Sequence, residues 1–332
     1  MTETVYDVVA LGNAIVDVIA PVEPDFIQAW SIEPNAMSLI EEDRAKQLTQ
    51  AAKGAEHSGG SAANTVAGIA SFGGNTGYIG KVSEDRLGAF FRKDMAAQGI
   101  CFETEPLADG PATARSIIFV TPDGARSMNT YLGASVLFSA SDVDESMVRQ
   151  AGILYLEGYL FDREAAKTAF VHASELAAAA GRKVALTLSD QFCVERHRAS
   201  FLHLIRNHVD ILFANEVELL ALYETDDFEA AIAQLQKDSP LAAITRSEKG
   251  SAVIQAGQDP LYVEAEPVAQ VIDTTGAGDQ YAAGFLYGLA RAKPLGICAR
   301  LGHIAAAEVI SHYGPRPETS YKDLADQGGI AL

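Results

Sequence analysis

Basic residues, cysteines and long apolar runs are scarce in this chain of 332 residues. Lys and Arg number 25 against 44 Asp and Glu, so the formal net charge is −19, which argues against nonspecific binding of nucleic acid or anionic membranes. The three cysteines are far apart and form no C-x-x-C pair, so we expect neither a disulfide framework nor a structural zinc site. No Lys or Arg precedes Arg44 and no apolar run reaches membrane-spanning length, so we expect a cytoplasmic protein without a signal peptide.

Short apolar segments alternate with amphipathic segments of helix length through most of the chain. Such an alternation is typical of a mostly parallel sheet with helices on both faces. The sequence therefore predicts an α/β fold. Its expected strands are 6–11, 152–156, 183–188, 209–214 and 242–245, and a helical pattern covers 163–180.

Two segments interrupt the alternation. Residues 14–20 continue directly from the first strand, and residues 113–131 have the pattern of two strands around the turn Thr-Pro-Asp-Gly. We expect them to form a small β layer, either a lid that excludes water from a reaction or an edge hairpin without a gating role. The predicted division is a large α/β domain of residues 1–12, 40–110 and 137–332, and a small β layer of residues 13–39 and 111–136.

The stretch VIDTTGAGDQYAAGFLYG, residues 271–288, places glycines and a carboxylate where a helix should begin. The N-terminus of a helix offers free N–H groups and a partial positive charge, and glycine lets a ligand approach the backbone, so this is a candidate anion site. Asp279 would repel an anion there unless it has another task, such as accepting a proton from an attacking nucleophile.

Two polar motifs near the N-terminus each have a functional and an ordinary interpretation. In LGNAIVDV, Asn13 and Asp17 share one face of an extended chain and could bind vicinal hydroxyls, or Asn13 could cap a turn while Asp17 is solvated. In HSGGSAANT, Gly60, Ser61 and Asn64 could let a substrate lie against the backbone, or Ser61 could cap a helix that packs closely.

The segment FANEVELL, residues 213–220, follows an expected strand and opens a helix. Asn215 and Glu218 are three residues apart, so their amide and carboxylate could organise a hydrated Mg²⁺. The same spacing is that of an N-cap and N3 pair that stabilises any helix.

Together and in this order, the motifs resemble those of the ribokinase-like family of carbohydrate and nucleoside kinases, from residue 7 to about 317, with DTTGAGD as the strongest signal. GGSAANT, SIEPNAMSLIEED and LGHIAAAEVI are similar to the adenosine kinase branch. One departure is Thr245-Arg246-Ser247, where the family usually has Thr-x-Gly. The resemblance implies a three-layer αβα sandwich with a mostly parallel central sheet and a small β-sheet lid.

The resemblance also implies a role for each matching position. Asp279 would be the general base, and the N–H groups of Gly276, Ala277 and Gly278 would hold the charge on the transferred phosphoryl group. The implied substrate-binding residues are Asn13, Asp17, Gly60, Ser61 and Asn64 around the ribose, and Leu132, Ala134, Tyr159 and Phe192 around the base. The implied cofactor-binding residues are Asn215, Glu218, Thr245 near the phosphates and His303 near the ATP adenine, with Glu218 contacting Mg²⁺ through water. Many members also use a monovalent cation such as K⁺.

The sequence thus predicts an ATP-dependent and Mg²⁺-dependent kinase that phosphorylates the 5′-hydroxyl of adenosine or a similar nucleoside, as in purine salvage. One alternative is a sugar kinase of the same family acting on ribose, fructose or a keto-deoxy sugar acid, for which an inward arginine such as Arg115 would be expected. A nucleoside-binding protein without catalysis is another alternative, but the intact DTTGAGD segment argues against it. We expect a monomer or homodimer that binds a small molecule and neither nucleic acid nor membrane.

Overall fold

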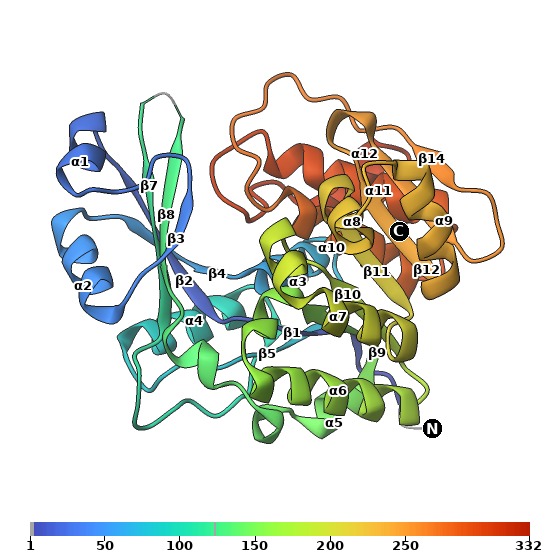
Figure 1. Cartoon of the computed structure of the whole chain (residues 1–332), viewed down its shortest axis with the longest axis horizontal. Helices are drawn as coiled ribbons and strands as arrows, with labels where there is room; N and C mark the ends of the chain where they lie inside the picture. The colour runs from blue at the N-terminus through green and yellow to red at the C-terminus, as the bar shows by residue number, and fades with distance from the viewer. Residues whose placement is uncertain (1–2, 123) are drawn as a thin grey trace.

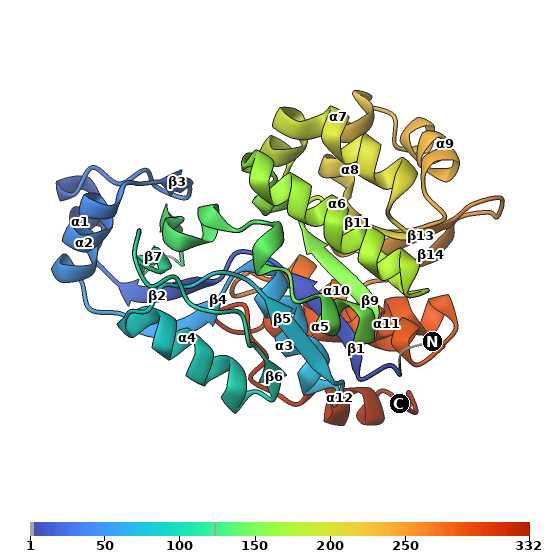
Figure 2. The same ribbon diagram turned by 90° about the horizontal axis from the view of Figure 1, so that it is seen from below.

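The computed structural model describes residues 3–122 and 124–332. It contains a large part built around one sheet and a small β layer that projects from one end of it (Figures 1 and 2). The predicted turn at 121–124 includes Asp123, which lies outside the described residues. In the part of the chain that is described, no helix combines the length and apolarity needed to cross a membrane.

The large sheet has nine strands within the described residues, in the order β14-β13-β12-β11-β10-β9-β1-β5-β6. All neighbours from β12 to β6 are parallel, and β13 and β14 are antiparallel additions at one edge. The predicted mostly parallel sheet is therefore confirmed. The strands are β1 (Tyr6–Leu11), β5 (Thr76–Ile79), β6 (Ile100–Cys101), β9 (Ala151–Glu157), β10 (Lys183–Thr187), β11 (Ile211–Asn215), β12 (Leu241–Thr245), β13 (Ser251–Gln255) and β14 (Leu261–Val263).

Helices cover both faces of this sheet (Figure 2). One face carries α5 (Glu145–Gln150), α6 (Glu164–Ala179), α7 (Gln191–Asn207), α8 (Glu216–Tyr223) and α9 (Phe228–Asp238), and the other carries α3 (Ser61–Ser71), α4 (Arg86–Ala97), α10 (Ala277–Ala290), α11 (Leu295–Val309) and α12 (Tyr321–Gln327). In β1, Val8 and Ala10 belong to one core and Val9 and Leu11 to the other. Because a fully buried aliphatic side chain stabilises the fold by about 1.5–3 kcal/mol, continuous apolar strands favour this two-sided burial.

Short 3₁₀ turns complete the large part. They are η1 (Gly133–Leu137), η2 (Ala140–Asp142), η3 (Gly158–Asp162) and η4 (Ser247–Lys249). Of these, η3 follows the carboxyl end of β9 directly, and η4 follows that of β12 after one residue. Both therefore lie at the sheet edge where open α/β folds bind ligands.

The small β layer is a second sheet in the order β3-β8-β7-β2-β4. Its strands are β2 (Ile15–Pro21), β3 (Met37–Leu39), β4 (Ala55–Gly59), β7 (Ala114–Val120) and β8 (Arg126–Tyr131), and its helices are α1 (Pro24–Ala29) and α2 (Glu42–Ala51). The two helices cover one face, where Leu48 of α2 packs in a core with Ile117 and Phe119 of β7.

This layer takes in more of the chain than the predicted 13–39 and 111–136. Strand β4 pairs antiparallel with β2, so the first segment extends to residue 59 and the boundary expected at residue 39 needs correction. The segment AEHSG lacks the alternation of apolar residues that predicts a strand. Its pairing with β2 is a long-range property of the fold.

Candidate active site

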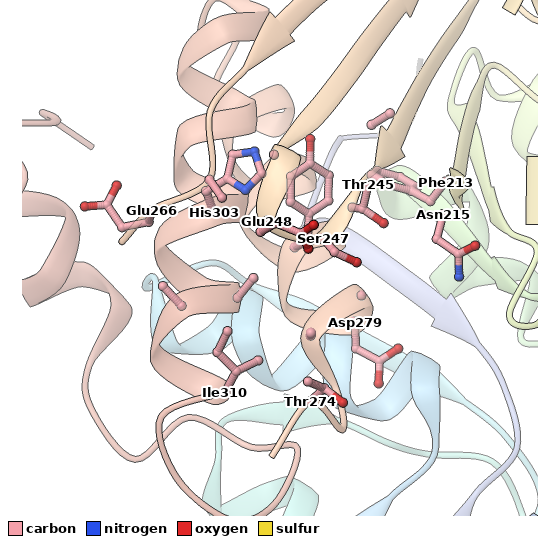
Figure 3. Close-up of a pocket in the computed structure, with 18 of the residues that line it drawn as sticks. Phe213, Asn215, Thr245, Ser247, Glu248, Glu266, Thr274, Asp279, His303 and Ile310 are labelled. Carbon is pink, nitrogen blue, oxygen red and sulfur yellow. The ribbon is translucent and has the colours of Figure 1, made fainter. Parts of the chain in front are cut away.

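A cavity of about 770 Å³ lies at the carboxyl ends of β11 and β12 and at the N-terminus of α10. A cavity of this size is in the range of small-molecule sites. In Figure 3, Asp279 and Asn215 lie toward one side of the cavity, and His303 and Glu266 lie toward the other. Its lining includes Ser61, Phe213, Asn215, Glu218, Thr245, Ser247, Glu266, Thr274, Ala277, Gly278, Asp279, Tyr281, His303 and Ile310.

The turn before α10 together with the first three residues of that helix, residues 273–279, is called the anion loop below. The Asp273 carboxylate stabilises the conformation of this loop by accepting hydrogen bonds from the N–H groups of Thr275 and Gly314, both at 3.0 Å. Gly276 has a φ of 81°, and a Cβ there would meet Pro315 at 2.7 Å. This position therefore requires glycine.

The anion loop presents free backbone donors to the cavity. The Ala277 N–H donates to the carbonyl of Thr274 at 3.2 Å, whereas the N–H groups of Gly276, Gly278 and Asp279 find no acceptor among the residues that the structure describes. A Cβ on Gly278 would meet nothing within 4 Å. The backbone at residue 278 is therefore open to an anion, and of the three predicted donors Ala277 alone already has a partner.

Asp279 lies at the same helix N-terminus, with its carboxylate held on both sides. One oxygen accepts a hydrogen bond from Ser61 Oγ at 2.6 Å and the other from Asn64 Nδ2 at 2.9 Å. Burial raises the pKa of Asp279 to about 6, although both hydrogen bonds and the charge of Arg316 act to lower it. Such a carboxylate is mostly ionised at pH 7 and close enough to neutrality to exchange a proton.

Residues 58–64, which run from the end of β4 into the first turn of α3 and are called the substrate loop, meet the end of β1. A Cβ on Gly60 would collide with the carbonyl oxygen of Asn13. Asn13 donates to one oxygen of Glu157 through its N–H at 3.2 Å and its Nδ2 at 2.9 Å, and the Ala62 N–H donates to the other at 2.8 Å. Glu157 is 1% exposed, and burial raises its pKa to about 7. The sequence analysis did not identify Glu157. Its carboxylate connects the motif that contains Asn13 to the substrate loop.

Asp17 belongs to β2 of the small layer and is buried. Its carboxylate lies against Gly59, where a Cβ would collide with it. Burial raises the pKa of Asp17 to about 7, opposed by the charges of Arg316 and Arg126 and reinforced by that of Asp279. The structure thus brings the predicted polar pair, Asn13 and Asp17, to the substrate loop that also holds Asp279.

An arginine from the small layer reaches the anion loop. Arg126 of β8 forms an ion pair with Asp273 at 2.6 Å, and both side chains are less than 10% exposed. Arg115, the arginine expected to point inward, instead lies over the ring of Tyr131 at 5.9 Å, and Tyr131 belongs to the core beneath α1 and α2. It shares a strand with Ser116, which pairs with Asp17, and successive side chains face opposite ways. Arg115 therefore faces away from Asp17.

Asn215 and Glu218 form the capping box that their spacing allows. Glu218 accepts from the Asn215 N–H at 3.0 Å and Nδ2 at 2.6 Å, and its own N–H donates to Asn215 Oδ1 at 2.8 Å. Burial raises the pKa of Glu218 to about 7. Within the described residues no group of three His, Cys, Asp or Glu could hold a metal directly. Both side chains line the cavity with oxygen atoms, so they fit a Mg²⁺ that keeps its waters.

The Thr245-Arg246-Ser247 segment has Ser247 at the position where the resemblance implies a glycine. Ser247 has a φ of 51°, a left-handed conformation that glycine adopts without strain. Arg246 pairs with Glu216 at 3.2 Å and lies 4.1 Å from the ring of Phe228. Thr245 and Ser247 line the cavity.

His303 lines the far side of the cavity and is 7% exposed. The Tyr281 hydroxyl donates to Ser251 Oγ at 2.9 Å, and Ser251 Oγ lies 2.9 Å from His303 Nε2. Burial lowers the pKa of His303 to about 4. The imidazole is therefore neutral at pH 7 and offers an uncharged ring edge to a ligand.

The four residues expected around a base lie outside this cavity. Ala134 is fully buried and Leu132 half-buried, both near η1. Tyr159 is 36% exposed and Phe192, at the start of α7, is 68% exposed. Their predicted place around a nucleoside base therefore stays a prediction.

Comparison with known proteins places this site in a family. Residues 26–320 match the family described as pfkB family carbohydrate kinase. The crystal structure of adenosine kinase from Sinorhizobium meliloti is 50% identical, with a TM-score of 0.90 over 97% of this chain and 99% of that one. The structure of a probable sugar kinase protein from Rhizobium etli CFN 42 is 46% identical, with a TM-score of 0.92 over 99% and 100%.

A more distant relative extends the comparison to plants. Adenosine kinase 2 of Arabidopsis thaliana is 25% identical over 92% of this chain and 93% of its own length. The ribokinase-like fold expected from the motifs is confirmed by the structural neighbours. The chain belongs to the pfkB family of carbohydrate kinases, and it is a phosphotransferase with an alcohol group as acceptor.

Proposed function

We propose that the protein transfers the γ-phosphoryl group of ATP to the 5′-hydroxyl of adenosine or a similar nucleoside. The observation that carries the proposal is the meeting of Asp279, the open N–H groups of the anion loop and the Ser61 and Asn64 side chains at one helix N-terminus. The half-identical adenosine kinase of Sinorhizobium meliloti supports the nucleoside as acceptor.

In the proposed reaction the Asp279 carboxylate accepts the proton of the 5′-hydroxyl as that oxygen attacks the γ-phosphorus. The new O–P bond forms while the bond from the γ-phosphorus to the β,γ-bridging oxygen breaks, and ADP leaves. The N–H groups of Gly276 and Gly278 hold the charge on the transferred group. Asn215 and Glu218 would hold Mg²⁺ through water molecules. When it is bound, the Mg²⁺ supplies positive charge at the phosphates.

The substrate side follows from the polar residues of the small layer and the substrate loop. The Asp17 carboxylate and the Asn13 amide, whose Nδ2 is fixed by Glu157, would bind the ribose hydroxyls. The cavity beside His303 would hold the adenine of ATP, because the neutral ring adds no charge to it. Thr245 would lie near the phosphates.

A sugar kinase is the second candidate, favoured by the probable sugar kinase of Rhizobium etli. A keto-deoxy sugar acid would need a free cation beside Asp17. Arg115 faces the opposite side of its strand, Arg126 is paired with Asp273, and Arg316 is hydrogen-bonded to Ser58 and Gln98. These placements favour a neutral acceptor and thus a nucleoside, ribose or fructose over a sugar acid.

A two-step experiment tests the proposal. Thermal shifts are measured with adenosine, other nucleosides, ribose, fructose and a keto-deoxy sugar acid, and ADP release with Mg·ATP is then measured for each compound that binds. We expect adenosine to give the largest shift and rapid ADP release. A shift with sugars alone would replace the proposal by the sugar kinase, and nucleoside binding without ADP release would indicate a binding protein that has lost catalysis.

A further inference from the structure

Arg316, between α11 and α12, reaches the substrate loop from the other end of the chain. Its Nη2 donates to the Ser58 carbonyl at 2.7 Å and to Ser58 Oγ at 3.0 Å, and its Nη1 donates to Gln98 Oε1 at 3.1 Å. Asp94 completes the network by accepting from the N–H of Ser58 at 3.1 Å and from Gln98 Nε2 at 3.1 Å. Ser58 is therefore held from two sides, immediately before the glycines of the substrate loop.

The neighbouring residue ties the same segment to the anion loop. Pro315 packs against Gly276, and its carbonyl accepts a hydrogen bond from Gln280 Nε2 at 2.8 Å. The same Gln280 amide donates to the carbonyl of Asn64 at 3.0 Å. Residues 315 and 316 therefore contact both loops that hold the proposed base.

The charge of Arg316 interacts electrostatically with carboxylates from three elements. These are Asp94 of α4, Asp17 of β2 and Asp279 of α10, and the Tyr78 hydroxyl of β5 is also near. Its Nε is buried without a hydrogen-bond partner among the described residues. The network with Ser58 thus leaves part of the guanidinium unpaired in a buried site, where its field acts on nearby charges with little screening.

The other ionisable groups around the two active-site carboxylates are mainly acidic. Asp17 faces Arg126 and Asp279 besides Arg316. Asp279 also interacts with Glu157, Glu218 and the hydroxyls of Tyr155 and Tyr159. Of these groups, Arg316 is the cation that acts on both Asp17 and Asp279.

We propose that Arg316 is a positioning residue, which clasps the substrate loop to the anion loop and places its positive charge beside the buried carboxylates of Asp17 and Asp279. The inference rests on the proposed function, because it assigns Asp279 as the base whose ionisation sets the rate. Arg316 touches neither reacting atom and acts through these two side chains.

The first test is the pH dependence of kcat/KM in Arg316→Met, Arg316→Lys and the wild type. We expect the acid limb to move upward by roughly one pH unit or more in Arg316→Met, and to stay near the wild-type position in Arg316→Lys, which retains the charge. Arg206→Met removes an arginine that pairs with Asp238 on the surface, far from both loops, and should leave the limb in place. An unmoved limb in Arg316→Met, or equal shifts in the Lys and Met variants, would overturn the charge role.

A second measurement needs no activity and separates this inference from the proposed function. The folded protein retains protons on Asp17 and Asp279 up to about pH 7 and 6, whereas their unperturbed pKa is 3.8. Stability therefore falls as pH rises through this window, because the unfolded chain releases protons first. Thermal unfolding of Arg316→Met should show this fall extending to higher pH. Parallel curves for Arg316→Met and wild type would refute the inference even if nucleoside turnover is normal.

Discussion

Replacing Asp279 by Asn removes the proposed proton acceptor while nearly preserving its volume. Loss of a positioned general base lowers the rate by roughly 10²–10⁴-fold, which corresponds to about 2.7–5.5 kcal/mol of transition-state stabilisation. Nucleoside affinity should change little, because Asn13 and Asp17 are expected to bind the sugar. We therefore expect kcat to fall while the dissociation constant measured by calorimetry stays within a few fold.

The pH dependence of the rate provides a second quantitative test of the role of Asp279. Because the pKa of Asp279 is about 6, the base is about tenfold more ionised than protonated at pH 7, and the ratio reverses at pH 5. The protonation of Asp279 should therefore lower wild-type kcat about tenfold per unit below pH 6, whereas kcat/KM also contains the titration of Asp17. Ser61→Ala removes the donor at 2.6 Å and should move this limb upward by roughly one unit. Ser146→Ala on the surface helix α5 is the matched control.

ADP release coupled to a spectrophotometric signal, measured from pH 5 to pH 9, decides the matter. The reasoning would be refuted by an Asp279→Asn enzyme that keeps more than about a tenth of wild-type kcat. It would equally be refuted if that variant kept the same acid limb as the wild type. Either outcome would require another group to accept the proton.

Three further changes test other parts of the site. Gly278→Ala should fold with an unchanged Tm, because a Cβ there meets open space, yet lose roughly 10²–10³-fold in kcat by filling the anion site. Ser247→Gly should raise the unfolding free energy by about 1 kcal/mol in denaturant titrations, because it relieves a φ of 51°, with activity retained; a drop would contradict the strain argument. Glu157→Gln should raise the nucleoside KM and cost about 1–3 kcal/mol of stability, since its amide cannot accept from both Asn13 and Ala62; an unchanged KM would count against the positioning of Asn13.

The sequence pattern was enough to predict the position of elements with a strong apolar periodicity. Strand β1 begins and ends where it was expected, and α6 differs from the expected 163–180 by one residue at each end, because a buried strand and an amphipathic helix have strong local periodicities. The capping box of Asn215 and Glu218 also follows from spacing alone. Local chemistry decides these features, so a single sequence reveals them.

The features that the sequence did not reveal depend on contacts between distant segments. Glu157 binds Asn13 across 144 residues, and Arg316 binds Ser58 across 258. For the Glu157–Asn13 contact, the available signal was a Glu at the end of an apolar strand. The sequence around Arg316 contains no local signal for its contact with Ser58. Strand β4 was missed for the same reason, because its polar sequence forms a strand only when β2 pairs with it.

The residue expected to bind the sugar and the proposed base belong to different parts of the molecule. Asp17, expected to grip the acceptor sugar, is on the five-stranded sheet at one end of the molecule, whereas Asp279 is on a helix of the main sandwich (Figure 1). Any tilt of the outer sheet would carry the bound sugar, and with it the 5′-hydroxyl, away from Asp279. A nucleoside that contacts both residues would thus hold the two sheets in the reactive arrangement. An empty or poorly occupied site would then hydrolyse little ATP.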